Sequence, residues 1–265
     1  TTDVATVFPD RCRSDGHFYA LDFELFEIRQ LFVHERVLTN SDSSNIMAFQ
    51  KRFPPIQKLF KIPTLAEEIA MISGLNLSRG RTAGIYVELK SPRMHLEAGY
   101  NISDIVINEL MKTEYRIGGS PVYIQCFDDA TLKHLKFELN IDYPLIQLLG
   151  ENEWEEDTEA DYEELASSDG LKHVSSYAAG IGPWIEQILI GCSPSGEPIA
   201  SDLIDVANGF NLLIHPYTFR KDQLPQGIGT FEALLHFFLV EHKVDGIFTD
   251  FPDLAINFID EFSIR

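Results

Sequence analysis

Residues 122–149, VYIQCFDDATLKHLKFELNIDYPLIQLL, contain two short apolar runs separated by a stretch with helical periodicity. The runs Val122–Phe127 and Leu145–Leu149 are apolar on both faces, which is typical of parallel strands buried on both sides. Between them, Asp129–Leu139 carries leucines at helical spacing. A strand, a helix and a second strand in this order predict a βαβ unit.

The same alternation of strand and helix extends from residue 83 to the C-terminal end. Four further strands are predicted at Ala83–Leu89, Ala178–Ile181, Asn211–His215 and Gly246–Thr249, and further helices at Ile102–Thr113, Phe231–His242 and Asp253–Phe262. A closed (β/α)8 barrel, or TIM barrel, has eight strands. The six predicted strands therefore indicate a barrel-like α/β fold whose first two strand units are missing from this chain. An open, doubly wound sheet is the alternative.

Residues 1–80 do not supply the two further strands. The segments Asp22–Gln30 and Pro63–Ile72 predict helices joined by loops. Thr64 followed by Glu67 has the pattern of a capping box at the start of the second helix.

The predicted domain covers residues 1–265, with residues 1–80 as a loop and helix insertion and residues 81–265 as six βα units. Its most unusual part is the loop at residues 150–170, GENEWEEDTEADYEELASSDG, in which ten of 21 residues are acidic. The loop directly follows a strand, so we expect it at the barrel face where active sites lie. It predicts a solvated loop with a short acidic helix. Cation binding is the alternative, although the residues do not follow the ligand pattern of an EF-hand.

The charge and composition exclude several classes of partner. The 265 residues carry a formal net charge of −20, which argues against nucleic acids and anionic membrane surfaces, because both are bound through Lys and Arg. No apolar run reaches the ~18 residues of a membrane span, and the polar start TTDVATVFPD does not predict a signal peptide. The three cysteines lack zinc-site spacing. A small phosphate-bearing substrate remains compatible, because a bound metal ion can reverse the local field.

Polar side chains end the first predicted strand. Glu88 and Lys90 are two residues apart, so they point to the same side of the strand. At the carboxyl end of a barrel strand, such a pair belongs to the active-site mouth. The carboxylate can bind a hard cation and the lysine can hold a phosphate oxygen. A buried salt bridge that stabilises the barrel interior is the structural alternative.

Other strand ends also carry candidate substrate-binding residues. Gln125 and Phe127 share one face of the second strand, Gln147 lies near the end of the third, His215 ends the fifth and Asp250 follows the sixth. Phe219, with Trp184, is a candidate for an apolar wall on the loops after the strands. The chain contains no G-x-S-x-G, P-loop or G-x-G-x-x-G motif, so nucleophile-elbow and nucleotide-binding folds have no support.

Several strings, taken together in this order, resemble the glycerophosphodiester phosphodiesterase family of the bacterial periplasmic type. They are VATVFPDRCRSDGHFYALDFELFEIRQL, RFP at Arg52–Pro54, PTLAEEIAMISGLN, GIYVELKSP, VYIQCFD, HPYTFR and GIFTDFPDLAINFI. The resemblance covers nearly the whole chain, and the acidic loop is the main divergence.

The resemblance implies a TIM barrel that hydrolyses glycerophosphodiesters, such as glycerophosphocholine, to an alcohol and glycerol 3-phosphate. It implies a Ca²⁺ or Mg²⁺ ion held by three carboxylates, of which the third matches Glu88. The neighbouring catalytic lysine of the family matches Lys90. Positions at or near the family's substrate pocket are matched by Gln125, Phe127, His215 and Asp250.

The departures from the family affect its catalytic groups. The family's first strand ends in His-Arg-Gly, its next strand carries two metal carboxylates, and a His-Asp follows; all of these precede the position that matches Thr1. The two histidines are the family's general acid and base, so we expect residues 1–265 alone to hydrolyse glycerophosphocholine only at the background rate. The alternative to an enzyme is a non-catalytic remnant or binding domain of the same fold.

Two further expectations concern the self-association of the chain and its location. A barrel that lacks two strands exposes two sheet edges, which predicts self-association. The resemblance implies a periplasmic or secreted location.

Overall fold

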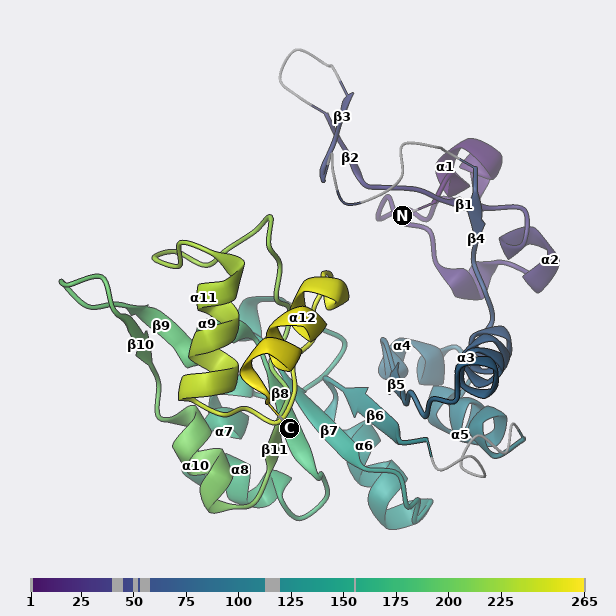
Figure 1. The fold of residues 1–265 in the computed structure, drawn as a ribbon. Coiled ribbons are helices and arrows are strands. Elements are labelled where there is room, and N and C mark those ends of the chain that lie inside the picture. The colour runs from purple at the N-terminus through teal and green to yellow at the C-terminus, as the bar shows by residue number, and fades with distance from the viewer. Residues whose placement is uncertain are drawn as a thin grey trace. The chain divides into compact units, whose positions relative to one another are not determined.

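The computed structural model describes residues 2–39, 45–49, 52, 58–112, 120–154 and 156–264. Thr113, at the end of one predicted helix, and the last two residues of the RFP string therefore lie outside the described residues. Two compact units, Thr1–Gly74 and Leu75–Arg265, make up the chain (Figure 1).

The first unit contains short helices and two antiparallel strand pairs. Its elements are α1 (Val4–Val7), η1 (Pro9–Arg11), η2 (Ala20–Asp22), α2 (Leu25–Ile28), β1 (Phe32–Val33), β2 (Val37–Thr39), β3 (Asn45–Met47) and β4 (Phe60–Lys61), and α3 (Leu65–Arg79) begins in it. β1 pairs with β4 and β2 pairs with β3. The four described strands of this unit thus pair only among themselves.

The predicted capping box at the start of α3 is confirmed. The backbone N–H of Thr64 donates to Oε2 of Glu67 at 2.8 Å, and the N–H of Glu67 donates to Oγ1 of Thr64 at 3.3 Å. The helix extends to Arg79, beyond the predicted end at Ile72. These bonds satisfy two of the N–H groups that every helix start leaves unpaired.

The second unit is built on a five-stranded parallel sheet. Its strands are β5 (Ile85–Glu88), β6 (Val122–Cys126), β7 (Leu145–Leu149), β8 (Gly180–Pro183) and β11 (Leu213–Ile214), in the order β11-β8-β7-β6-β5. Neighbouring strands follow the order of the chain, so the sheet has no point at which strand order reverses. A doubly wound sheet requires such a reversal. The order therefore fits a barrel-type fold and excludes the open alternative.

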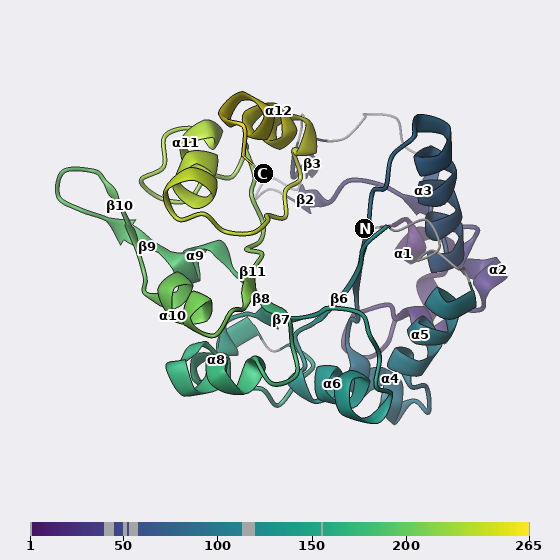
Figure 2. The same ribbon diagram turned by 60° about the horizontal axis from the view of Figure 1, so that its bottom comes forward.

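Helices follow the strands and lie on the outer side of the curved sheet (Figure 2). They are α4 (Pro92–Glu97), α5 (Ile102–Lys112), α6 (Asp129–Lys133) with the π-helix η4 (His134–Glu138), α7 (Tyr162–Ala166), α8 (Ser168–Val174), α9 (Ile185–Ile188), α10 (Leu203–Gly209), α11 (Phe231–Leu235) with the π-helix η6 (His236–Glu241), and α12 (Pro252–Phe262). A short 3₁₀ turn, η5 (Asn152–Trp154), follows β7. Asp128 caps α6 by accepting from the N–H of Thr131 at 2.8 Å. The predicted α/β alternation is confirmed.

The sixth predicted strand, Gly246–Thr249, does not form a regular strand. It runs beside the end of β11, where the N–H of Phe248 donates to the carbonyl of Pro216 at 3.0 Å. The ladder stops here because Pro216 has no N–H to donate. In addition, the carboxylate of Asp245 takes the N–H of Ile214 at 2.8 Å. The prediction of six strands is therefore corrected to five regular strands and one extended segment.

Aromatic side chains connect the two edges of the sheet across its interior. Tyr86 lies on the edge strand β5, and His215 directly follows the opposite edge strand β11, yet the Tyr86 hydroxyl is 2.9 Å from Nδ1 of His215. Tyr123 stacks on Tyr86 at 5.0 Å between ring centroids, and Phe248 meets Tyr86 edge-on at 4.8 Å. The sheet is therefore curled as in a barrel, although the described strands do not close it.

A hairpin of β9 (Leu189–Cys192) and β10 (Pro198–Ala200) lies outside the sheet, between α9 and α10, and was not predicted. Ile190 and Ile199 are 60% and 41% exposed, and Leu189 is the one buried residue of the two strands, so the hairpin lacks the alternation of buried apolar residues by which sequence patterns reveal strands. Within the part of the chain that the structure describes, no helix has the length and apolar character of a membrane span.

Candidate active site

A cavity of about 420 Å³ opens at the carboxyl ends of the strands. It receives side chains from β5 and β6, from the acidic loop after β7, and from the segments after β11. Its lining residues are Glu88, Lys90, Gln125, Phe127, Leu148, Trp154, Glu156, Tyr217, Thr218, Arg220, Phe248, Thr249 and Asp250. The structure thus brings together five of the eight predicted site residues: Glu88, Lys90, Gln125, Phe127 and Asp250.

Glu88 and Lys90 form an ion pair at the mouth of this cavity. Nζ of Lys90 lies 2.7 Å from Oε1 of Glu88, and the two side chains are 73% and 26% exposed, respectively. The pair is therefore not a buried salt bridge in the barrel interior, which was the alternative interpretation of these two residues. Exposed pairs of this kind contribute little to folding, so Lys90 can turn to a bound anion at small cost.

Gln125 lies beside Glu88 in the register of β5 and β6. Paired residues in a parallel ladder point to the same side of the sheet, so both side chains face the cavity. The Gln125 residue is only 7% exposed, and none of the described residues donates a hydrogen bond to its Oε1. A buried acceptor without a donor costs about 1–3 kcal/mol. We therefore expect Oε1 to accept a hydrogen bond from a bound molecule.

Arg220 and Asp250 form a second ion pair on the cavity wall. Nε of Arg220 lies 2.7 Å from Oδ2 of Asp250, and both side chains are about one-third exposed. The backbone around Asp250 is held by Thr249, whose hydroxyl donates to the carbonyl of Phe219 at 2.8 Å. Arg220 was not among the predicted site residues. β11 ends at Ile214, so Arg220 stands well beyond the strand end and its position in the sequence gave no signal of this kind.

Three predicted site residues lie elsewhere in the unit. Gln147 is fully buried; its Nε2 donates to the carbonyl of Phe127 at 2.9 Å, and its Oε1 accepts from Tyr177 at 2.9 Å. Phe219 is also fully buried and packs edge-on against Phe238, with ring centroids 4.9 Å apart. His215 belongs to the aromatic layer beneath the cavity. The structure does not bring these three side chains to the cavity wall.

The acidic loop contributes an aromatic wall to the cavity. A Cβ built on Gly150 would lie 3.0 Å from the Trp154 ring and 3.3 Å from the Phe127 ring, so both rings pack over this glycine. Behind Trp154, the ring of Trp184 packs edge-on at 5.2 Å between centroids. The lack of a side chain at residue 150 therefore lets the loop bring Trp154 next to Phe127.

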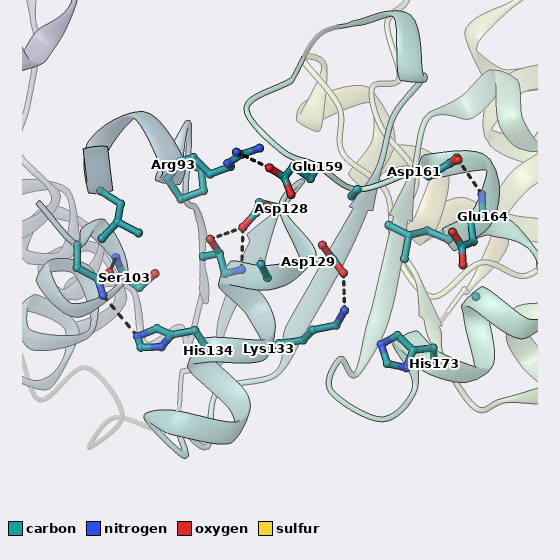
Figure 3. A pocket seen from close by; sticks show the side chains of 18 of the residues that line it. Arg93, Ser103, Asp128, Asp129, Lys133, His134, Glu159, Asp161, Glu164 and His173 are labelled. Carbon is teal, nitrogen blue, oxygen red and sulfur yellow. Dashed lines mark hydrogen bonds and ion pairs between the residues drawn. The ribbon is translucent and has the colours of Figure 1, made fainter. Parts of the chain in front are cut away.

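The loop is fastened at a second cavity, outside the sheet, of about 850 Å³ (Figure 3). There Arg93 forms an ion pair with Glu159, as Figure 3 shows. The nitrogen and oxygen atoms of this pair are 2.7 Å apart. The Thr158 hydroxyl donates to Asp128 at 2.8 Å, and Asp157 accepts from the N–H of Met94, also at 2.8 Å. The loop was predicted to be solvated; α7 is its short acidic helix, but residues 157–159 are tied to α4 and to the start of α6.

The described residues do not fit the metal that the resemblance implies. They contain no group of three or more His, Cys, Asp or Glu residues that could hold a metal ion. In the cavity, Glu88 and Asp250 are each paired with a cation. Glu88, the predicted Ca²⁺ or Mg²⁺ ligand, is thus one carboxylate without a set of oxygen ligands around it, which is a poor site for a hard cation.

Named relatives resemble this chain over almost its full length. The glycerophosphodiester phosphodiesterase of Haemophilus influenzae is 34% identical over 272 residues, which cover 97% of this chain and 74% of the relative. That of Treponema pallidum is 30% identical over 272 residues, with 97% and 76% covered.

Solved structures support the fold. A protein of Silicibacter pomeroyi named for the same family has a TM-score of 0.64 at 18% identity and covers 95% of this chain and 74% of its own. A glycerophosphodiester phosphodiesterase from Parabacteroides distasonis has a TM-score of 0.52 at 14% identity, with 88% and 79% covered. These likenesses bear on the fold alone, and they confirm the TIM-barrel class.

The profile of the Glycerophosphoryl diester phosphodiesterase family matches residues 1–254. Together with the identities to the named relatives, this match establishes that the chain belongs to the glycerophosphoryl diester phosphodiesterase family.

Proposed function

We propose that the cavity at the strand ends is the substrate site of a glycerophosphodiester phosphodiesterase. The reaction takes up one water and yields an alcohol and glycerol 3-phosphate. The observation that carries the proposal is that two cations, Lys90 and Arg220, line the same cavity as Gln125. None of the described residues donates a hydrogen bond to the amide oxygen of Gln125. Family membership supports the same substrate class.

In this proposal, the phosphodiester anion binds between Lys90 and Arg220. Each cation already faces a carboxylate at 2.7 Å, so a phosphate oxygen joins an existing ion pair without burying a lone charge. The guanidinium of Arg220 can offer two parallel N–H groups to phosphate oxygens, which fixes their orientation. Oε1 of Gln125 accepts from a glycerol hydroxyl, and this removes the cost of its missing donor.

Turnover needs proton transfer as well as binding. Hydrolysis breaks the bond between phosphorus and the head-group oxygen, joins the water oxygen to phosphorus and puts a proton on the leaving alcohol. No histidine is among the described residues that line the cavity. A domain that binds glycerophosphodiesters without hydrolysing them is therefore the second candidate. This second candidate agrees with the prediction that residues 1–265 alone release product only at the background rate.

The two candidates are separated by measuring turnover and binding on the same sample. Purified residues 1–265 are incubated with glycerophosphocholine and Ca²⁺ or Mg²⁺, with a chelator control, and glycerol 3-phosphate is quantified. Binding of glycerophosphocholine is measured in parallel by calorimetry. Metal-dependent release supports the enzyme and the metal dependence; binding without release supports the binding domain. A folded sample that neither binds nor hydrolyses the diester refutes both.

A further inference from the structure

The charges of the cavity do not balance. Its lining has two ion pairs, Lys90 with Glu88 and Arg220 with Asp250, and one further carboxylate, Glu156. None of the described residues forms an ion pair or hydrogen bond with the side chain of Glu156, which lies in the acidic loop. The cavity therefore carries one negative charge more than its cations compensate.

Tyr217 lies close enough to the carboxylates of the cavity to be affected by their charges. Burial is the main cause that raises the pKa of its hydroxyl; Tyr162 raises it further, followed by the charges of Glu156, Glu88 and Glu151. The hydroxyl itself is held by the carbonyl of Leu149 at 2.7 Å. The carboxylates therefore act on one part of the cavity wall, where a cation would be stabilised.

Aromatic surface lies beside this negative charge. Trp154 precedes Glu156 by two residues and lines the same cavity, next to Phe127 over Gly150. Tryptophan is the side chain that binds cations best through its ring face. Quaternary ammonium groups have no N–H to donate, so they are bound by aromatic faces and nearby negative charge rather than by hydrogen bonds.

The acidic loop is held by tertiary contacts both before and after Glu156 in the sequence. On one side, Trp154 packs against Trp184. On the other, residues 157–159 are fastened to Met94, Asp128 and Arg93 at the second cavity (Figure 3). The chain on both sides of Glu156 is thus held before any ligand binds, which lowers the ordering cost of binding.

A separate feature of the same cavity also points to a ligand. Oε1 of Gln125 is buried and lacks a donor among the described residues, on the wall formed by β6. Such atoms are rare in folded proteins. A donor would satisfy this acceptor and a cation would compensate the extra carboxylate, and a glycerophosphodiester with a charged alcohol supplies both.

We propose that Glu156 and Trp154 form a subsite for a cationic head group, so that the chain prefers glycerophosphodiesters whose alcohol carries a quaternary ammonium. This inference rests on the proposed function, because it uses Lys90 and Arg220 as the phosphate site. The volume of about 420 Å³ lies in the range of small-ligand sites. Phosphate and ammonium then each meet groups of opposite charge in the cavity.

The test compares two ligands that differ in the head group. Glycerophosphocholine has a quaternary ammonium, whereas glycerophosphoglycerol has a neutral alcohol. The chain has two tryptophans, Trp154 and Trp184, and they touch each other, so intrinsic fluorescence reports ligand entry into this cavity. We expect glycerophosphocholine to bind about 3- to 10-fold more tightly, which is the size of one partly exposed cation–π contact with one ion pair.

The preference should depend on one charge. Glu156→Gln should bring the two dissociation constants together, whereas Glu153→Gln, an exposed acidic residue of the same loop that does not line the cavity, should keep the preference. Calorimetry repeats both titrations without relying on fluorescence. Equal affinities in the unaltered chain, or a preference that survives Glu156→Gln, overturn the inference while the proposed function stands. If neither diester binds a folded sample, the proposed function fails and the inference falls with it.

Discussion

The hydroxyl of Tyr86 lies 2.9 Å from Nδ1 of His215, although the two residues stand at opposite edges of the parallel sheet. Hydrogen bonds between strands link only neighbours, so this contact can form only if the sheet curls upon itself. It lies one layer beneath the candidate active site, because Glu88 and Tyr86 are two residues apart on the same face of β5. The contact therefore supports the floor of the cavity.

Loss of the Tyr86 hydroxyl should destabilise the second unit. We expect Tyr86→Phe to lower the free energy of unfolding by about 0.5–1.5 kcal/mol, because one hydrogen bond of the interior is removed. Tyr123→Phe is the matched control: its ring stacks on Tyr86, and no hydrogen bond of its hydroxyl occurs among the described residues. Urea unfolding of both variants gives the two values. Equal losses would show that the Tyr86–His215 hydrogen bond does not itself contribute to the free energy of unfolding.

Acidification should weaken the fold through His215. Burial lowers the pKa of His215 below its usual value, whereas an unfolded histidine titrates near pH 6.5. Between these two values the unfolded chain binds more protons, so the stability contribution of neutral His215 is present above about pH 6.5 and is lost as the pH falls below it.

The measurement is the melting temperature between pH 7.5 and pH 5. His215→Gln removes the titrating ring, so its melting temperature should fall less on acidification than that of the unaltered chain. His173→Gln, a change at an exposed histidine, should leave the full pH dependence. Parallel curves for the unaltered chain and His215→Gln would contradict the assignment.

Removal of either phosphate-binding cation should weaken substrate binding without unfolding the protein. We expect Lys90→Ala and Arg220→Ala each to raise the dissociation constant of glycerophosphocholine about 10-fold, because each removes a charge-assisted contact worth roughly 1.5 kcal/mol. Lys112→Ala removes an exposed lysine of α5, which is paired with Glu109, and should not change the affinity. Calorimetric titration measures these dissociation constants. An unchanged affinity in both cation variants would show that this cavity is not the phosphate-binding site.

The contact between β8 and β11 depends on a glycine. A Cβ on Gly180 would lie 2.5 Å from the carbonyl oxygen of Leu213 and 2.9 Å from the Ile146 side chain, so Gly180→Ala should destabilise the sheet by about 1–3 kcal/mol. Gly209→Ala, at the end of α10, meets no atom within 4 Å and should be neutral or slightly stabilising. Thermal unfolding of the two variants compares them directly. A neutral Gly180→Ala would mean that β11 can move away from β8.

Local pattern was enough to place the parallel strands and several of the helices. Apolar runs and helical periodicity located β5, β6 and β7, together with α5 and the helix formed by α6 and η4, and the Thr64–Glu67 spacing located the start of α3. These features depend on interactions between residues close in the chain. The sixth strand was placed correctly along the chain but not as a regular strand, because Pro216 and the Asp245 carboxylate, outside that segment, interrupt its pairing.

The set of residues that line the cavity depended on strand register and on packing between distant segments. β7 is apolar on both faces, so its sequence does not say which residues point inward. The register pairs Gln125 with Ile146 and Cys126 with Gln147, which turns Gln147 away from the side on which Gln125 lines the cavity. Leu148 takes the place at the wall instead.

Residue type and strand-end position were sufficient to predict that Glu88, Lys90, Gln125, Phe127 and Asp250 lie together, because all carboxyl ends of a parallel barrel meet at one face. Trp154, Glu156 and Arg220 could not be assigned in this way. Their positions come from contacts over long sequence distances: Glu159 with Arg93, Thr158 with Asp128, and Arg220 with Asp250. Such contacts form only when the folded strands bring their loops together, and no local pattern encodes them.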